Sequence, residues 1–370
     1  MKNIKFSFIA LCMAAAFASC KRGDNGPSVD DNILNYQIPD VPVTQDYVVG
    51  AFYYNTGSTF NANITEVPVV GKYTMPNGVV PPAVMSKHIE YAGKAGLDYF
   101  TFMYRSPNRD VNNFKSDSAV IKSFKDANTT ANMKYALAYN FNPGTFGITT
   151  TSPLENDATK LEQFMQDVIR MVPYFKEANY MKVNGKALFY LMNAFNLYSN
   201  NNPQIYATLR TRLSALGVEL YIVGMQERWS PPARYPFRFQ NCVDAIYHQT
   251  YSQVNDWDRW YLLPQTMDQN WKYSKQWFAD NIKVDYVPNI SPAYSWKILS
   301  PTSVNPEYPR TDNGAMYKKL CNVAKLNASS TTRLILIDSW NKWDEDMQLE
   351  PAQSYGESYL DMTKKQFKKQ

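Results

Sequence analysis

The sequence predicts an α/β fold, a single (β/α)₈ barrel with long loops after the strands. Eight stretches rich in β-branched and aromatic residues alternate along the chain with amphipathic helical patterns. The last strand pattern, Leu334 to Ile337, runs directly into a segment with two Trp and four carboxylates. Barrels of this kind hold their chemistry at the carboxyl ends of the strands. An open doubly wound sheet is the competing architecture, but no Gly-rich phosphate loop follows the first strand.

The expected strands are short apolar or aromatic runs, in chain order 47–54, 97–104, 134–141, 187–192, 218–225, 244–250, 285–290 and 333–338. Helical patterns separate them at 81–96, 117–127, 160–176, 203–217, 265–281, 313–325 and 355–367. Gly96 closes the first helix, and Leu209, Leu213 and Leu216 give the fourth one apolar face. Only the helix between the fifth and sixth strands is poorly indicated.

The amino end has the features of a lipoprotein signal peptide. Lys2 and Lys5 precede an apolar stretch that ends at Phe17, and small residues then lead to Cys20. We expect residues 1–19 to be removed, Cys20 to be lipidated and residues 20–46 to form a polar, flexible tether. Residues 47–370 then form the folded domain. An ordinary cleaved signal is the alternative.

Composition excludes several classes of function. The net charge is +5, and the basic residues are scattered except for the terminal pairs Lys364-Lys365 and Lys368-Lys369, so no nucleic-acid partner is expected. The two histidines, His88 and His248, are far apart, and we expect no metal and no cofactor. Cys242 and Cys321 either pair or remain buried thiols. We expect a monomer.

Aromatic and polar residues follow the expected strands and should converge on the barrel mouth. We expect the substrate to be bound by Tyr53, Tyr54, Tyr104, Arg105, Tyr139, Asn140, His248, Gln249, Trp296, Trp340 and Asn341. Asn55, Asn193, Arg228, Tyr251 and Tyr294 belong to the same rim. Flat aromatic faces with amide and charged groups are typical of a carbohydrate cleft. For His248 the alternative is a hydrogen-bond network in the barrel wall.

The segment after the last strand reads Ser339-Trp340-Asn341-Lys342-Trp343-Asp344-Glu345-Asp346-Met347-Gln348-Leu349-Glu350-Pro351. It resembles the WNEWxEGxxxEP signature of glycoside hydrolase family 99 and of the related WbsX-type domains. The block from Phe175 to Tyr190 is similar to a second block of that family. The resemblance spans nearly all of residues 47 to 367. It implies a (β/α)₈ fold and an activity of the endo-α-mannosidase or mannanase type.

The resemblance assigns Glu345 to the acid/base glutamate of that family. The family's first glutamate, which activates the sugar 2-hydroxyl, falls on Lys342 in this chain. Because glycoside cleavage usually needs two carboxyl groups, a second one must be found elsewhere. Glu227, at the end of the fifth strand, is our first choice; its alternative is an ion pair with Arg228. Asp344 and Asp346 are further candidates, whereas Glu350 is expected to be structural.

Two hypotheses about function follow from these residues. In the first, the chain is a lipoprotein of the outer membrane, on the cell surface or facing the periplasm, that hydrolyses a polysaccharide. In the second, it binds glycans without cleaving them, because the base was lost at Lys342. Glycan synthesis, which the WbsX name suggests, is disfavoured because export separates the protein from sugar-nucleotide donors.

The anchor gives a first prediction. Replacing Cys20 with Ala should release the protein from the membrane fraction, because no acyl chain can then be attached. Cell fractionation with immunoblotting measures this, and a Ser19→Ala variant that keeps the cysteine is the control. Retention of the Cys20→Ala protein in the membrane fraction would show that it is not a lipoprotein.

Overall fold

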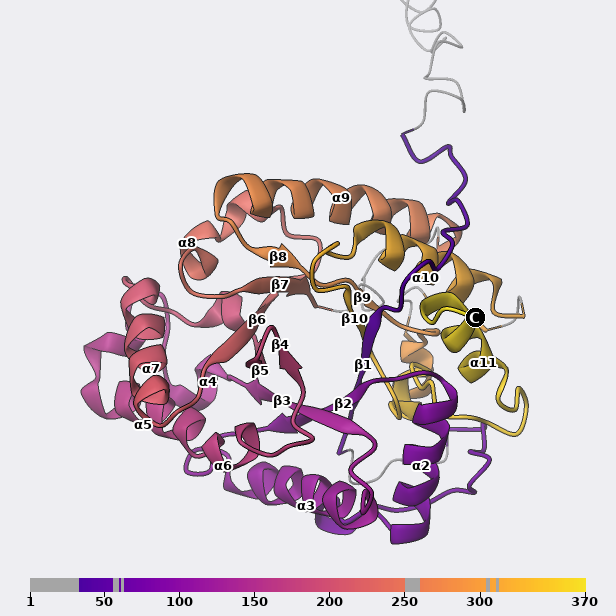
Figure 1. The fold of residues 1–370 in the computed structure, drawn as a ribbon, viewed down its shortest axis with the longest axis horizontal. Coiled ribbons are helices and arrows are strands. Elements are labelled where there is room, and N and C mark those ends of the chain that lie inside the picture. The colour runs from indigo at the N-terminus through magenta and orange to yellow at the C-terminus, as the bar shows by residue number, and fades with distance from the viewer. Residues whose placement is uncertain (1–32, 56–59, 61–62, 250–259, 304–306, 311–312) are drawn as a thin grey trace, which may run out of the picture. The chain divides into compact units, whose positions relative to one another are not determined.

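A closed sheet of parallel strands forms the centre of the computed structural model, which describes residues 33–55, 60, 63–249, 260–303, 307–310 and 313–370. The main strands are β1 (Val48–Tyr53), β2 (Tyr99–Tyr104), β3 (Lys134–Asn140), β5 (Lys186–Met192), β6 (Leu220–Gln226), β7 (Ala245–His248), β8 (Asp285–Tyr286), β9 (Asn289–Ile290) and β10 (Leu334–Ile337). The sheet order is β8-β7-β6-β5-β3-β2-β1-β10-β9. Figure 1 shows helices surrounding these strands.

The ring closes through the expected seventh strand. Its first part, β8, pairs with β7, and its second part, β9, pairs with β10. Only Val287 and Pro288 separate the two parts. Both residues join the ring through backbone hydrogen bonds. The Val287 amide donates to the Ile246 carbonyl, and the Pro288 carbonyl accepts from the Leu336 amide. Eight strand positions therefore close the sheet, which confirms the predicted (β/α)₈ fold.

The longer helices are α2 (Pro82–Lys94), α3 (Val111–Ala127), α5 (Ala158–Ile169), α7 (Asn202–Ala215), α9 (Leu263–Asn281), α10 (Ala315–Asn327) and α11 (Ser358–Phe367). Shorter elements are α4 (Pro143–Phe146), α6 (Val172–Phe175), α8 (Pro236–Phe239) and β4 (Lys182–Val183), which pairs antiparallel with β5. The expected helix at 160–176 is divided into α5 and α6. Between β6 and β7 the longest helix of the described residues is the four-residue α8.

Residues 38–370 form one compact unit. The signal peptide, Cys20, the tether up to residue 32 and Tyr251 lie outside the described residues. Within the described part, no helix is both long and apolar enough to cross a membrane. Cys242 and Cys321 are both buried and form no disulfide with each other. Of the two alternatives, the structure therefore shows buried free thiols.

Aromatic side chains fill the barrel interior. The rings of Phe52, Tyr190 and Tyr247 meet there, with centroids 5.8 to 6.3 Å apart. The hydroxyl groups of Tyr99 and Tyr190 are 2.7 Å apart. Gly50 makes room for Tyr99, because a Cβ atom at position 50 would lie 2.1 Å from Cζ of that ring. This packing predicts that the glycine is essential for the core.

Gly50→Ala should therefore lower the free energy of unfolding by about 1–3 kcal/mol, as overpacked cores do. Gly93→Ala is the matched control: its added Cβ meets nothing within 4 Å and it lies in α2, where Ala is the better helix former. Urea denaturation measures both. Equal stability of the two variants would contradict the packing described for Tyr99.

Candidate functional site at the carboxyl end of the barrel

Alternation along the strands decides which side chains reach the mouth. Gly50 and Phe52 face the interior, and in the parallel register Gly50 is paired with Tyr99 and Leu336. Two residues beyond Phe52 and Leu336 lie Tyr54 and Asp338, which share their inward direction. The residues between them point outward, toward the helices.

Three of the expected binding residues face outward. The Tyr53 hydroxyl lies 2.9 Å from Nδ1 of His88 in α2. The Tyr104 ring packs on Phe114 in α3, and the Tyr139 hydroxyl donates to Asp167 in α5, at 2.7 Å. Each tyrosine is at most 2% exposed. Tyr53, Tyr104 and Tyr139 thus lie in the barrel wall, because each lies at or next to the end of a strand and points to its outer face.

His248 also lies in the wall. Its ring is fully buried beside Phe278 of α9, and Nδ1 is 2.7 Å from the Tyr286 hydroxyl. Burial lowers the pKa of His248 to about 3, although a backbone hydrogen bond with Ser230 opposes the shift. The imidazole is therefore neutral near pH 7, and the structure favours the alternative of a network in the wall.

Trp340 and Asn341 are buried next to the barrel mouth. The Trp340 side chain is completely buried, and its ring packs edge-on against Phe100 and His88. The Asn341 side chain accepts a hydrogen bond from the Tyr54 amide at 2.8 Å and donates one to the Tyr54 carbonyl at 2.9 Å. Asn341 therefore holds Tyr54 in place, and the fully buried Trp340 offers no open face for stacking.

Four side chains meet at the inward end of β1 and β10. The Tyr54 hydroxyl donates to Oδ1 of Asp338, at 2.9 Å. The ammonium group of Lys342 lies 5.5 Å from the centre of the Tyr54 ring and donates to Oε1 of Glu345. The Lys342 and Glu345 side chains are 14% and 4% exposed, so this ion pair is largely removed from water. Asp338, which is 6% exposed, is a buried carboxylate that the sequence analysis did not select.

The charges in this cluster affect one another. Burial raises the pKa of Tyr54 well above its usual range, and the nearby carboxylates Asp338 and Glu345 add to the effect. Tyr54 therefore remains a protonated hydrogen-bond donor. Burial also raises the pKa of Asp344. The charge of Lys342 opposes this shift, and the charge of Glu345 adds to it. A raised pKa makes the protonated form of Asp344 more accessible.

The loop after β6 contributes the opposite side of the mouth. Burial lowers the pKa of Arg228, although Tyr294, Glu227 and Glu345 favour its charge. Glu227 accepts from the hydroxyl of Ser230 at 2.6 Å and lies 3.2 Å from Arg234. The ion pair of Glu227 is thus made with Arg234, and its side chain is one-third exposed at the rim.

The other expected binding residues lie around the rim. Arg105 binds both oxygens of Asp117 in α3 and also Asn55. The Asn140 side chain accepts from Asn193 at 3.2 Å. The Gln249 amide donates to the carbonyl of Gln226, and half-buried Trp296 begins a short helical turn after β9.

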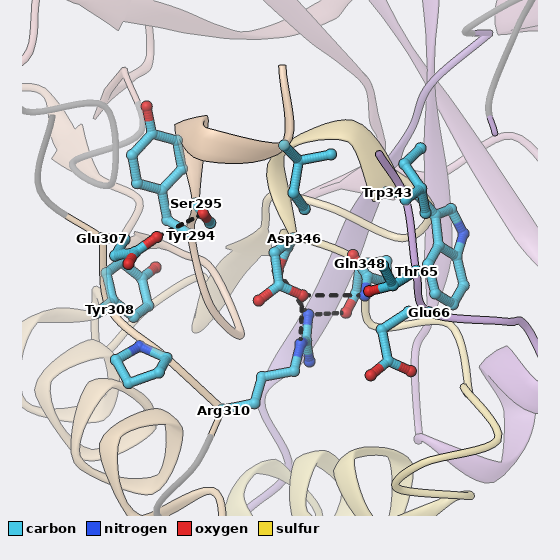
Figure 2. A pocket seen from close by; sticks show the side chains of 13 residues that line it. Thr65, Glu66, Tyr294, Ser295, Glu307, Tyr308, Arg310, Trp343, Asp346 and Gln348 are labelled. Atoms are coloured by element: carbon cyan, nitrogen blue, oxygen red, sulfur yellow. Dashed lines mark hydrogen bonds and ion pairs between the residues drawn. The ribbon is translucent and has the colours of Figure 1, made fainter. Parts of the chain in front are cut away.

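A cavity of about 350 Å³ opens beside the cluster, between the loops after β1, β9 and β10. Its lining is Ile64, Thr65, Glu66, Tyr294, Ser295, Ile298, Glu307, Tyr308, Pro309, Arg310, Trp343, Asp346 and Gln348. Figure 2 shows Arg310 reaching to Asp346 and Gln348, with Glu307 and Glu66 on opposite sides. This volume lies at the lower end of the range of small-molecule sites, which is about 300–1,000 Å³.

Arg310 fixes the loop that carries Glu345. Its guanidinium donates to Oδ1 and to the carbonyl of Asp346, at 2.9 and 2.7 Å, and to the carbonyl of Gln348. It is stacked on Tyr355 and Tyr359, about 5 Å from each ring centre. Asp346 has a φ of +55°, a conformation that Asp tolerates better than most residues. Asp346, where the family signature has Gly, is therefore a partner of Arg310.

Glu350 has a structural role, as expected. The hydrogen-bond partners of its carboxylate are other side chains. The Tyr73 hydroxyl and Nε1 of Trp343 donate to Oε2, at 2.9 and 2.8 Å. Nε2 of His88 is 2.9 Å from Oε1, and Nδ1 of the same ring faces the Tyr53 hydroxyl. This network joins α2 to the turn that contains Glu345. Among the residues that the structure covers, no group of three His, Cys, Asp or Glu could hold a metal ion.

Comparisons with solved structures place the fold among glycosidase-type (β/α)₈ barrels. A structure described as a glycoside hydrolase-like protein has a TM-score of 0.82 and 30% identity, over 92% of this chain and 99% of its own. The GH99 endo-alpha-mannosidase from Bacteroides thetaiotaomicron is similar in fold, with a TM-score of 0.59 and 20% identity over 86% and 95% of the chains. A GH5-4 endoglucanase from Clostridium longisporum gives 0.52 and 12%, over 86% and 96%.

The family is shown by sequence as well. The model of the family described as Glycosyltransferase WbsX matches residues 151–363, more than half of the chain. The chain therefore belongs to the WbsX family. Curated proteins give no match in sequence.

Two parts of the mouth were not found from the sequence. Asp338 follows the strand Leu334–Ile337 directly, and counting the alternation along β1 and β10 would have identified it. Arg310 lies in a long irregular segment, where no sequence pattern points to the loop that it binds.

The Glu350 network gives a stability prediction. Glu350→Met removes the acceptor of three buried donors and should lower the free energy of unfolding by about 3 kcal/mol or more. Glu357→Met is the control, because Glu357 forms an exposed ion pair with Lys94, and exposed pairs contribute little to stability. Urea denaturation compares them, and similar losses would contradict the structural role of Glu350.

Proposed function

We propose that this protein hydrolyses a glycan, of the α-mannan type, at the mouth of its barrel. The observation that carries the proposal is the pair of buried carboxylates near Tyr54: Asp338 accepts from the Tyr54 hydroxyl, and the charge of Glu345 acts on the same tyrosine. Two carboxyl groups are what glycoside cleavage usually requires. The adjoining cavity, with Tyr294 and Trp343 in its lining, offers room for the sugar chain.

In this proposal Glu345 exchanges the proton with the glycosidic oxygen, and Asp338 serves as the second carboxylate. Asp338 is preferred to Glu227 because it points inward from β10 and is nearly buried, whereas Glu227 is one-third exposed and bound to Arg234. The Tyr54 hydroxyl orients Asp338 by its hydrogen bond. Asn341 in turn positions Tyr54.

Hydrolysis is favoured over transfer from a sugar nucleotide, the chemistry that the family description names. The carboxylates Asp338, Asp344 and Glu345 are gathered around the mouth. They would repel the two phosphates of a nucleotide sugar. The same carboxylates suit an uncharged glycosidic bond.

A second candidate function is glycan binding without cleavage. The contact of Lys342 with Glu345 favours it, because an ammonium group in the place of a base occupies an oxygen of the acid/base glutamate. Either function would be exercised outside the cytoplasm if Cys20 is lipidated. We propose such an anchor on the sequence of residues 1–20 alone.

Turnover on α-mannan oligosaccharides and other glycans tests the hydrolase. Glu345→Gln should lower kcat by about 10²- to 10⁴-fold, the usual contribution of an acid/base group. Asp338→Asn should act in the same direction, and Glu227→Gln, as the comparison, should have a much smaller effect. Wild-type turnover that survives Glu345→Gln would place the reaction on other residues.

Substitutions of Lys342 distinguish between hydrolysis and binding without cleavage. If wild type cleaves glycans, Lys342→Glu should impair it, because the change removes the ion pair that holds the Glu345 carboxylate in place. If wild type only binds, calorimetry should give affinity without turnover, and Lys342→Glu should gain hydrolysis. Lys342→Met removes the ion pair without adding a base and is the control for that gain.

A further inference from the structure

A second concavity, of about 500 Å³, lies on the side of the barrel between α10, α11 and the segment 40–43. We call it the lysine groove. Its charged side chains are five lysines and one aspartate, namely Lys318, Lys325, Lys365, Lys368, Lys369 and Asp40. Figure 1 shows α10 and α11 near the carboxyl end of the chain, with the segment before β1 crossing α10. The groove is separate from the mouth and takes no part in the proposed glycan chemistry.

Carboxylates neutralise only part of this charge. Lys318 pairs with Asp40 and Lys368 with Asp98, at 2.8 and 2.7 Å. Lys365 and Lys369 are exposed, and within the described part of the chain neither makes an ion pair. The lysine groove therefore carries an excess of positive charge at its rim.

Lys325 lies buried at the base of the groove. It is 7% exposed, and its ammonium donates to the Val41 carbonyl at 2.6 Å and to the side-chain oxygen of Gln366 at 2.8 Å. Both acceptors are uncharged. Buried cations are normally paired with an anion, and an ammonium has three N–H groups to donate.

The pKa of Lys325 reflects this environment. Burial lowers it, and the positive charge of Lys318 adds to that effect, while Asp40 opposes it. An anion bound in the groove would favour the charged ammonium and supply the missing counter-charge.

We propose that the lysine groove binds a phosphate group. Lys325 donates to it from the base of the groove, and Lys365 and Lys369 neutralise its charge from the rim. The volume exceeds that of a phosphate ion, so the groove also accommodates a phosphate that is esterified. The ligand is therefore either free phosphate or the phosphate of a lipid headgroup.

The proposed lipid anchor provides one source of phosphate groups. Segment 40–43, which lines the groove, is separated from Cys20 by about 20 residues. If Cys20 is lipidated, as proposed above, phospholipid headgroups are among the phosphate groups that the protein meets.

The test uses the mature chain from residue 20 with Cys20→Ala, so that no acyl chain contributes. Calorimetry measures inorganic phosphate, and sedimentation measures vesicles of phosphatidylcholine with and without phosphatidylglycerol. Lys365→Gln/Lys369→Gln should weaken binding by about tenfold or more, since each lysine near an anionic surface contributes about fivefold. Lys325→Met should abolish phosphate binding while leaving glycan affinity unchanged.

Lys115→Gln/Lys272→Gln is the matched control, because it removes the same charge from exposed positions on α3 and α9. Groove-dependent binding of phosphate alone identifies free phosphate as the ligand. Groove-dependent binding of phosphatidylglycerol vesicles identifies a headgroup. Absence of both, or equal loss in the groove and control variants, would overturn the proposal.

Discussion

Closure of the parallel sheet is the constraint on which the rest of the structure depends. Because β8 and β9 complete the ring between β7 and β10, each strand has one face toward a filled interior and one toward the helices. The aromatic packing of Phe52, Tyr190 and Tyr247 fills that interior. A residue at a strand end therefore reaches the mouth only if its position in the alternation points inward.

The loop after β10 is held from several sides, and the proposed chemistry follows from that restraint. Glu350 ties it to α2 through His88, Arg310 ties it to the segment after β9, and Asn341 couples it to Tyr54. A turn fixed in this way keeps Glu345 at a defined position. The ion pair with Lys342 then decides whether Glu345 is available, since Lys342 occupies an oxygen of the carboxylate on which hydrolysis would depend.

The two charged regions of the molecule have opposite character. The mouth gathers buried carboxylates, whereas the lysine groove gathers ammonium groups around the segment that leads toward the amino end. A neutral glycan suits the first region and an anion suits the second. Their separation means that the two can be altered independently, as the network around Glu350 and the contacts of Lys325 share no residue.

The sequence by itself determined the barrel, the order of its strands and the segment that carries Glu345, because local periodicity and a contiguous motif are properties of the chain. It also brought Lys342 to Glu345, since the two lie only three positions apart in the chain. Only the tertiary structure decided that Tyr53, Tyr104, Tyr139 and His248 lie in the wall, that Asp338 lies inward, and that Glu227 pairs with Arg234. Those outcomes depend on strand register and on loops that meet across the barrel, and contacts between distant segments leave no mark in the periodicity of either one.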